Sequence, residues 1–250
     1  MNNALTIRNL YGGYKGNELF QNFNLDVPKG QFTALVGPNG SGKSTLFRMI
    51  LKGLKKKSGQ ILVQGNEIDN IRQIDLAKLV AFIPQYYIFP EGFSVRQVIS
   101  MSDFAGRTCN DDEIDSALKT AGIEGLGDRM ANEISGGEAQ LVMLCRAICC
   151  KTKLILMDEP TSNLDINRQS QLLKAAKKLT EEEGKTVFCA IHDLNSAMNH
   201  ANWCHVLDAG KLYASGTPNE VFNENMLQDV FHSDAQIFTE PISGRRIIIA

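Results

Sequence analysis

The sequence lacks both long hydrophobic runs and a surplus of charge of one sign. No apolar stretch reaches the roughly 18 residues that a bilayer-spanning helix requires, and residues 1–6 lack both regions of a secretory signal. The 26 Lys and Arg nearly balance the 28 Asp and Glu, which gives a formal net charge of −2. Such a chain has no overall positive field to attract nucleic acid. We therefore expect a cytoplasmic protein without a transmembrane helix and with no nucleic acid as a partner.

Cysteine pairs with metal-ligand spacing are also missing. The six cysteines do not form two matching C-x-x-C pairs, so the sequence does not support a zinc site. Hydrophobic residues make up 43% of the 250 residues, which suffices for a buried core. We expect free, mostly buried thiols in a reducing compartment, at Cys109, Cys145, Cys149, Cys150, Cys189 and Cys204.

The most informative segment that is present is glycine-rich. Residues 37–45 fit the P-loop pattern G-x-x-x-x-G-K-[ST] without a mismatch, between an apolar strand at 32–36 and a helix-forming stretch at 45–51. Backbone N–H groups and the helix dipole of such a loop attract phosphate. A turn that merely joins two elements would explain the glycines but not the adjacent Lys-Ser pair. The predicted nucleotide-binding residues are Gly37, Pro38, Asn39, Gly40, Ser41, Gly42, Lys43, Ser44 and Thr45, with Lys43 on the β- and γ-phosphates and Ser44 on Mg²⁺.

A second candidate part of the site follows a hydrophobic strand predicted at residues 154–158. This strand ends in Asp158 and Glu159. In P-loop enzymes a strand-end Asp helps to hold Mg²⁺, and a neighbouring carboxylate can orient or deprotonate the attacking water. A solvent-facing strand end with two acidic residues is the alternative. With a P-loop upstream, we expect Asp158 to hold the metal and Glu159 to act on water.

Three further polar features have a structural interpretation, and the first two also have a functional one. Ser135 and Glu138 form the capping-box pattern before an apolar helical face, but the glycines between them also expose N–H groups that could bind an anion. His192 follows a buried strand, where a role toward phosphate competes with a structural one. Gln85 follows a strand-ending Pro, where an amide is usually a turn former. The residue pattern alone does not decide among these.

The order of predicted elements indicates an α/β protein with a helical insertion. Strands are expected at residues 5–10, 23–27, 60–63 and 79–83, and again at 154–158 and 186–191, with a helix from 166 to about 182. Between residues 85 and 150 the pattern is helical, and Asp111 or Asp112 is a candidate cap for one helix. We expect one domain over 1–250, with an α/β core at 1–84 and 151–250 and a helical subdomain at 85–150.

These motifs together resemble the nucleotide-binding subunit of ATP-binding cassette (ABC) transporters. The fold that this implies is a P-loop NTPase core, a mixed sheet flanked by helices, with an N-terminal antiparallel β part and an inserted helical subdomain. Residues 134–138 are similar to the signature motif, residues 154–159 to Walker B and residues 162–165 to the D-loop. Gln85 matches the Q-loop and His192 the H-loop. Tyr14 resembles the aromatic residue that stacks on adenine, with Tyr11 as a neighbouring candidate and a core position as the alternative.

The resemblance implies a mechanism that needs two subunits. In a head-to-tail homodimer, ATP and Mg²⁺ would lie between the P-loop of one copy and Ser135, Gly136 and Gly137 of the other. Glu159 would be the general base, and His192 would contact the γ-phosphate. The catalytic residues that the resemblance implies are Glu159, His192, Lys43 and Gln85. The residues that it implies as metal ligands are Ser44, Gln85 and Asp158. It also adds Asp165 and Tyr14 to the nucleotide-binding residues. Transmembrane permease subunits would be partners and, indirectly, an extracellular or periplasmic substrate-binding protein. The chain itself would lie at the inner face of the membrane.

Local sequence further resembles importers of iron chelates, haem and cobalamin. The similarity lies at residues 76–85, 192–197 and 216–222. Residues 102–107 depart from the Gly-Arg-x-Pro that this subfamily usually carries. Glu138 replaces the usual Gln, and Ala139 and Leu141 stand where Arg is common, so we expect weaker ATP-driven closure of the dimer. A soluble ABC ATPase in an assembly pathway and a nucleotide switch without turnover are the competing hypotheses.

Overall fold

The computed structural model describes residues 3–14, 16–102, 109–162, 164–241 and 244–249. Its strands are β1 (Asn3–Tyr14), β2 (Asn17–Pro28), β3 (Phe32–Val36), β4 (Ser58–Val63), β5 (Asn66–Glu67), β6 (Val80–Ile83), β7 (Leu154–Asp158), β8 (Thr186–Ala190), β9 (Trp203–Asp208), β10 (Lys211–Gly216), β11 (Gln236–Thr239) and β12 (Arg246–Ile249). Its α-helices are α1 (Lys43–Ile50), α2 (Gln73–Ala77), α3 (Val95–Ser100), α4 (Asp111–Ala121), α5 (Gly136–Cys149), α6 (Ile166–Glu183), α7 (Leu194–His200), α8 (Pro218–Val221) and α9 (Glu224–Phe231).

The central sheet has the order β10-β9-β3-β8-β7-β6 and separates two hydrophobic cores. Its strands are parallel except for β10, which pairs antiparallel with β9. Along β7, Leu154 and Leu156 enter one core, whereas Ile155 and Met157 enter the other. Successive side chains of a strand point to opposite faces, so a strand buried on both faces is apolar at every position. This is why the sequence of β7 shows no polar alternation.

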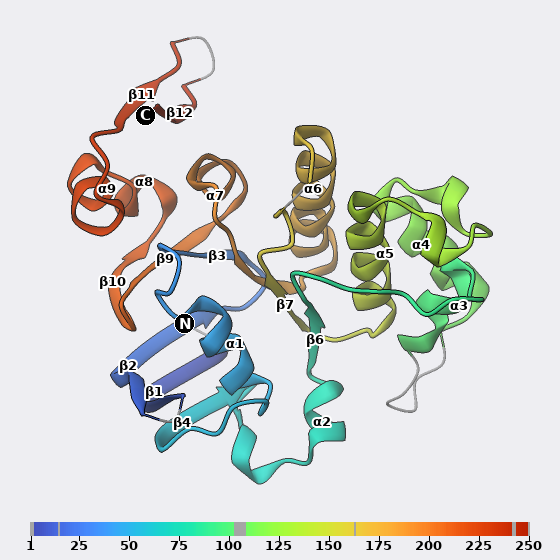
Figure 1. Cartoon of the computed structure of the whole chain (residues 1–250), viewed down its shortest axis with the longest axis horizontal. Coiled ribbons are helices and arrows are strands. Elements are labelled where there is room, and N and C mark those ends of the chain that lie inside the picture. Colours follow the sequence, from blue (N-terminus) through green and yellow to red (C-terminus); the bar gives the residue numbers. More distant parts are fainter. Residues whose placement is uncertain (1–2, 15, 103–108, 163, 242–243, 250) are drawn as a thin grey trace.

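The first core lies between the central sheet and an antiparallel sheet of order β2-β1-β4-β5 (Figure 1). Helix α1 fills the space between them, and Phe47 of α1 meets Phe188 of β8 edge to edge with ring centroids 5.2 Å apart. The expected N-terminal antiparallel part and mixed core sheet are thus confirmed. Their packing fixes the beginning of α1 at the end of β3.

The second core lies on the other face of the sheet, against α5, α6 and α7. Helices α3, α4 and α5 form a group beside the sheet (Figure 1), in the expected helical region. The exact boundaries of that subdomain stay a prediction. Among the described residues, no helix is long and apolar enough to cross a bilayer. The longest, α6, carries Lys177–Glu181 and Lys178–Glu182 ion pairs on its surface.

The N-terminus of α4 differs from the sequence prediction. Asn110, not Asp111 or Asp112, is the N-cap, and its side chain accepts a hydrogen bond from the Glu113 backbone N–H at 2.9 Å. The Glu113 side chain reaches back to the Asn110 N–H, which completes a capping box. Asp111 and Asp112 are already in the first helical turn, where the helix dipole stabilises negative charge. The cap was missed because several neighbouring residues have capping side chains.

The cysteines are free thiols, as expected. Cys145, Cys149, Cys189 and Cys204 are buried, while the other two are partly exposed. Burial raises the pKa of Cys204 to about 12. Thiols of this kind stay protonated and pack as small apolar groups.

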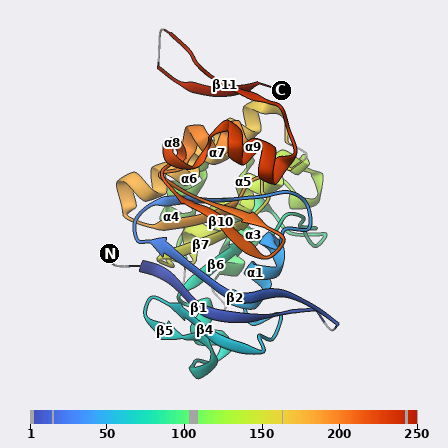
Figure 2. The same ribbon diagram turned by 90° about the vertical axis from the view of Figure 1, so that its left-hand side faces the viewer.

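The residues that follow α9 form a hairpin, β11–β12, at the end of the molecule opposite the antiparallel sheet (Figure 2). No sequence motif marks this region. Asn195 of α7 holds the hairpin, because its side chain accepts from the Ile248 N–H at 2.8 Å and donates to the Ile248 carbonyl at 3.0 Å. Arg246 adds hydrogen bonds to the carbonyls of Asn219 and Phe222. The hairpin is thereby tied to α7, whose N-cap, Asp193, follows His192.

His205 on β9 is a buried histidine whose titration should affect stability. Its side chain is 1% exposed, Nε2 donates to the Asp26 carbonyl at 3.0 Å, and Nδ1 has no hydrogen-bond partner among the described residues. Burial lowers the pKa of His205 to about 4. In the unfolded chain the imidazole has its ordinary pKa and takes up a proton at higher pH than in the folded protein.

We therefore expect stability to fall as pH drops from about 6.5 to about 4, with a contribution from His205 of up to about 3 kcal/mol. Replacing His205→Gln keeps a donor toward Asp26 and removes the titration. Urea unfolding across this pH range should show a smaller loss of stability in the variant. Identical slopes in both proteins would contradict this assignment.

Candidate functional site

The P-loop lies between the end of β3 and the beginning of α1, as the sequence predicts. Gly42 is the N-cap of α1 and has φ 114°, in the left-handed region that glycine tolerates best. Gly37 has a different constraint: a Cβ atom there would lie 2.1 Å from the Leu207 carbonyl oxygen. The loop therefore fits against β9 only with a glycine at this position. Its open side faces a cavity of about 240 Å³ lined by Asn39, Gly40, Gly42, Lys43, Ser44, Thr45 and Glu159.

Lys43 is almost fully buried and lies across this cavity. Only 4% of it is exposed. Its ammonium donates to the carbonyls of Gly37 at 2.8 Å and Pro38 at 3.3 Å, and it lies 3.3 Å from Glu159 Oε1. A buried cation is costly unless it is paired. Three oxygen partners satisfy its three N–H bonds and hold it at the mouth of the loop.

Ser44 and Asp158 meet although they lie 114 positions apart in the chain. The Ser44 hydroxyl donates to Asp158 Oδ1 at 2.9 Å. Burial raises the pKa of Asp158 above its usual value, and the hydrogen bond from Ser44 opposes this effect. Hydroxyl and carboxylate oxygens are the donors that Mg²⁺ prefers, so this pair fits a magnesium site.

Glu159 also lines the cavity, and Gln85 contacts Glu159. The chain turns directly after β7 because Glu159 has φ 45°, and its N–H donates to the Ala190 carbonyl of β8. Its carboxylate then accepts from Gln85 Nε2 at 3.2 Å through Oε2 and faces Lys43 through Oε1. Gln85 is held in turn by Gln140 of α5, whose side chain donates to the Gln85 carbonyl at 2.7 Å. Gln140 and the contact it makes with Gln85 had no signal in the sequence.

Tyr14 stands at the end of β1 and is 47% exposed. Its hydroxyl accepts from Arg48 of α1 at 2.6 Å. Tyr11 is 37% exposed. Neither tyrosine is a core residue, so that alternative is wrong for both. Arg48, which fixes Tyr14 over the P-loop helix, is a residue that sequence reasoning missed.

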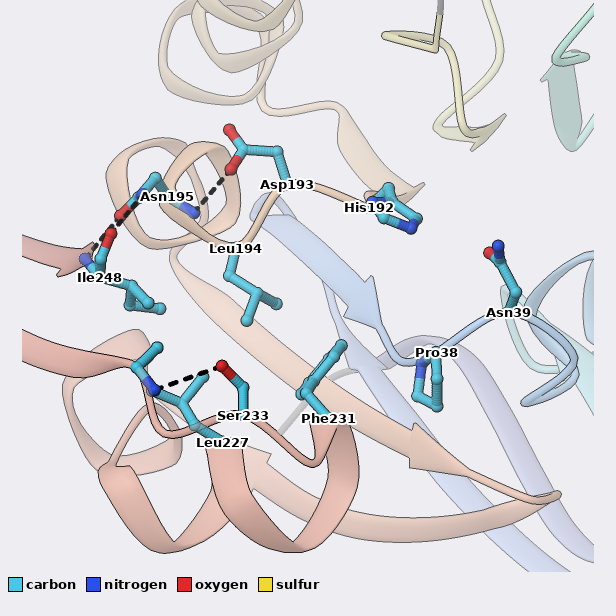
Figure 3. Close-up of a pocket in the computed structure, with 11 residues that line it drawn as sticks. Pro38, Asn39, His192, Asp193, Leu194, Asn195, Leu227, Phe231, Ser233 and Ile248 are labelled. Carbon is cyan, nitrogen blue, oxygen red and sulfur yellow. Dashed lines mark hydrogen bonds between the residues drawn. The ribbon is translucent and has the colours of Figure 1, made fainter. Parts of the chain in front are cut away.

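His192 follows β8 and is exposed next to Asn39 of the P-loop. Figure 3 shows both side chains at the rim of a second cavity, of about 510 Å³, which is closed on its other side by α9 and the C-terminal hairpin. Asp193 caps α7 by accepting from the N–H groups of Asn195 and Ser196, which fixes where the loop of His192 ends. His192 is therefore at the nucleotide edge, but it lines the second cavity and not the one around Lys43.

The signature residues are separate from the P-loop cavity. Ser135 is the N-cap of α5, and the predicted capping box is present: Ser135 Oγ accepts from the Glu138 N–H at 3.3 Å, and Glu138 accepts from the Ser135 N–H at 2.9 Å. Ser135 and Gly136 are exposed. Neither lines the cavity around Lys43. The cap is thus confirmed, and anion binding at this helix end stays a prediction.

The D-loop is described only in part. Asn163 lies outside the described residues, as do residues 103–107 of the segment that departs from the importer pattern. Asp165 is the N-cap of α6 and accepts from the Arg168 N–H at 2.9 Å. Its side chain therefore has a structural role in this single chain.

The site thus combines a phosphate cradle, a Ser–Asp pair and a Glu held by Gln and Lys. A separate helix N-terminus, capped by a serine and followed by two glycines, completes the set. A family model for the ABC transporter matches residues 20–162, more than half of the chain. The chain belongs to the ABC transporter family. The resemblance drawn from the order of the motifs is thus confirmed.

Individual ABC relatives cover nearly the whole chain. The iron(3+)-hydroxamate import ATP-binding protein FhuC of Bacillus subtilis is 32% identical, over 99% of this chain and 94% of the relative. The petrobactin import ATP-binding protein FpuC of Bacillus anthracis is 35% identical, over 90% of this chain and 86% of the relative. A solved metal-chelate type ABC transporter in an inward-facing conformation superposes with a TM-score of 0.84 at 27% identity, covering 100% of this chain and 98% of that one. A dimeric bacterial ABC transporter cassette superposes with a TM-score of 0.76 at 26% identity, covering 86% and 98%.

The contact between Gly37 and Leu207 gives a test of the ABC site. We expect Gly37→Ala to displace the P-loop and to lower ATP affinity by at least about tenfold, because a methyl group cannot lie 2.1 Å from a carbonyl oxygen. Gly125→Ala, between α4 and α5 and outside this site, is the control, since a Cβ there meets no atom within 4 Å and its φ is not positive. Titration with a fluorescent ATP analogue compares the two. Equal losses in both variants would show that the close approach is not the constraint.

Proposed function

We propose that this chain is the ATP-hydrolysing subunit that powers an ABC importer of iron chelates. The observation that carries the proposal is the convergence of Lys43, Ser44 and Glu159 on one cavity, with Asp158 bonded to Ser44, at the carboxyl ends of parallel strands. Membership of the ABC family supports nucleotide hydrolysis, and the names of the relatives support import of an iron complex. A haem or cobalamin cargo is chemically related, but the relatives named here favour iron chelates.

The geometry supports a separate role for each of these residues in nucleotide binding. The N–H groups of the P-loop and Lys43 would bind the β- and γ-phosphates, and Tyr14, fixed by Arg48, would stack on adenine. Ser44, Asp158 and the amide oxygen of Gln85 are the oxygens that would hold Mg²⁺. Bound Mg²⁺ bridges phosphate oxygens and offsets the charge that develops on them.

Glu159 is the proposed general base. In the structure its two oxygens are engaged by Lys43 and Gln85. A bound phosphate would compete for Lys43, because it offers the same cation more negative charge. This competition would leave Glu159 free to accept a proton from a water in line with the γ-phosphate, with His192 steadying that phosphate. Binding of the substrate thus prepares the base.

One copy of the chain supplies only part of this site. Ser135, Gly136 and Gly137 lie at the N-terminus of α5, apart from the cavity around Lys43. A second copy, placed head to tail, would bring these N–H groups and their helix dipole to the γ-phosphate. The similarity to a dimeric cassette supports such a pairing. ATP would then favour a closed dimer, and hydrolysis an open one.

We further propose where the permease binds. An apolar groove of about 670 Å³ runs between α2, β6 and α5, and its lining includes Ile74, Phe82 and Met143. Tyr87 and Arg146 form a polar end, with a hydrogen bond of 3.2 Å between them. The groove also includes Pro84, next to Gln85. A short helix of the permease with apolar residues would fit here and would be coupled to the nucleotide through Gln85. An extracellular binding protein would act through the permease.

Loss of the base should separate binding from turnover. We expect Glu159→Gln to lower the ATPase rate by about 10²- to 10⁴-fold while ATP binding is retained, because the amide keeps the shape of the side chain but accepts no proton. Glu181→Gln, at a surface carboxylate of α6 that pairs with Lys177, is the control. A variant of Glu159 that turns ATP over normally would rule out this role.

Cells provide the test of the cargo class. A strain without this protein should lose uptake of a radioactive ferric hydroxamate or ferric catecholate, and the wild-type chain but not Glu159→Gln should restore it. The soluble assembly ATPase would be favoured instead by two results together. The strain would still take up all iron chelates, and the ATPase activity would not co-purify with any membrane protein.

The groove has its own test. Ile74 is 45% exposed in the groove, so Ile74→Glu places a charge where an apolar helix would pack. We expect co-purification of the permease to fall at least about tenfold, while ATP binding does not change. Phe238→Glu, at a residue of the hairpin that is 48% exposed, should have no effect on co-purification. Equal recovery of the permease with all three proteins would remove the groove as the docking site.

A further inference from the structure

The signature serine has its single hydroxyl proton engaged within its own helix cap. Ser135 Oγ lies 2.8 Å from Glu138 Oε2, in addition to accepting from the Glu138 N–H. A carboxylate only accepts hydrogen bonds, so the hydroxyl must be the donor in this contact. The carboxyl is ionised at neutral pH, because hydrogen bonds from Ser135 hold the pKa of Glu138 below its usual value. Ser135 therefore has no proton left for a phosphate until this bond breaks.

Arg168 of α6 approaches the other oxygen of the same carboxylate. Its Nη2 lies 3.3 Å from Glu138 Oε1, and the two side chains are 31% and 16% exposed. Its Nη1 donates to Gln171 at 3.0 Å, which directs the guanidinium along the helix. A Cβ on Gly137 would lie 3.1 Å from Arg168 Cγ, so the alkyl part of this arginine packs on the signature glycine. Arg168 thus joins α5 to the beginning of α6, where Asp165 is the cap.

This arrangement changes the expectation about missing positive charge. Leu141 is fully buried in the second core, so that position does not face the helix end in this chain. Arg168 supplies a cation beside Glu138 from a different helix, and Arg129 adds a weaker electrostatic effect. The carboxylate is therefore partly neutralised within its own subunit.

We propose that Glu138 and Arg168 are positioning residues that set how readily Ser135 captures the γ-phosphate bound to a second copy of this chain. Glu138 holds the hydroxyl proton and places negative charge at the helix end, which opposes phosphate. Arg168 draws the carboxylate toward α6 and offsets its charge, which favours phosphate. The inference rests on the proposed function, because it requires ATP to be clamped between two copies.

The chemistry of glutamine makes the role of Glu138 testable. An amide in this position removes the negative charge, and its NH₂ group can donate to Ser135 Oγ, which frees the hydroxyl proton for phosphate. Glutamine also satisfies the capping box, so the helix should still begin at the same residue. Arg168→Met keeps the alkyl packing on Gly137 and removes the cation. The two changes are therefore expected to act in opposite directions.

The experiment measures ATP-driven dimerisation with the purified full-length chain. All proteins carry Glu159→Gln so that Mg-ATP persists, and analytical ultracentrifugation gives the ATP concentration for half-maximal dimer. We expect Glu138→Gln to lower this concentration about tenfold and Arg168→Met to raise it about tenfold, as for loss of a charged hydrogen bond. In the double variant the effect of Arg168→Met should disappear, because the charge that it offsets is gone.

Two controls separate this role from a structural one. Glu113→Gln alters the equivalent capping box of α4, which also has a cationic partner, Lys151, and it should leave the ATP requirement unchanged. Thermal unfolding checks that each variant is folded. If Glu138→Gln leaves the ATP concentration for half-maximal dimer unchanged, the inference is overturned. It is also overturned if Arg168→Met raises that concentration by the same factor with Glu and with Gln at position 138. If the parent protein forms no dimer with Mg-ATP, the clamp itself fails, and the proposed function fails with it.

Discussion

The site depends on one constraint, the parallel arrangement of β3, β8 and β7 as neighbours in the central sheet. Parallel strands bring their carboxyl ends to the same edge, and each of these three is followed by functional residues. The P-loop follows β3, His192 follows β8, and Asp158 and Glu159 end β7. Because all three strands are buried on both faces, their positions are fixed by packing in two cores. The polar groups that follow these strands are therefore held in fixed positions at the edge.

Electrostatics at this edge are balanced by contacts across the sheet. Lys43 lies among backbone carbonyls and Glu159, and Asp158 accepts from Ser44. Lys43, Glu159 and Asp158 thus each have a partner, which lowers the cost of burial. The same partners are the groups that a nucleotide and a metal ion would engage. When a nucleotide and a metal ion bind, they would replace these partners of Lys43, Glu159 and Asp158. No uncompensated charge would then be placed in an apolar cavity.

The second functional region, at the N-terminus of α5, is built differently. Its geometry is local, since a capping box determines how Ser135 and Glu138 face one another. Its electrostatics are not local, because Arg168 reaches it from α6. Arg168 therefore connects α6 to the signature helix through its side chain, and it contacts Asp165 of the D-loop through its backbone N–H. A change in the position of α6 would move Arg168 relative to the Glu138 carboxylate, which accepts from the Ser135 hydroxyl.

The sequence by itself determined the local chemistry: the P-loop, the apolar strands, the capping box of Ser135 and Glu138 and the order of motifs follow from residue type and spacing. It could also give the fold class, because alternating αβ segments around a P-loop have few arrangements. The cap at Asn110 was missed, since adjacent Asn and Asp residues satisfy the same pattern. The contacts of Arg48 with Tyr14, Gln140 with Gln85 and Arg168 with Glu138 were decided only by the tertiary structure. These pairs join residues from different elements, and their partners depend on how helices pack on the sheet, which no local pattern records.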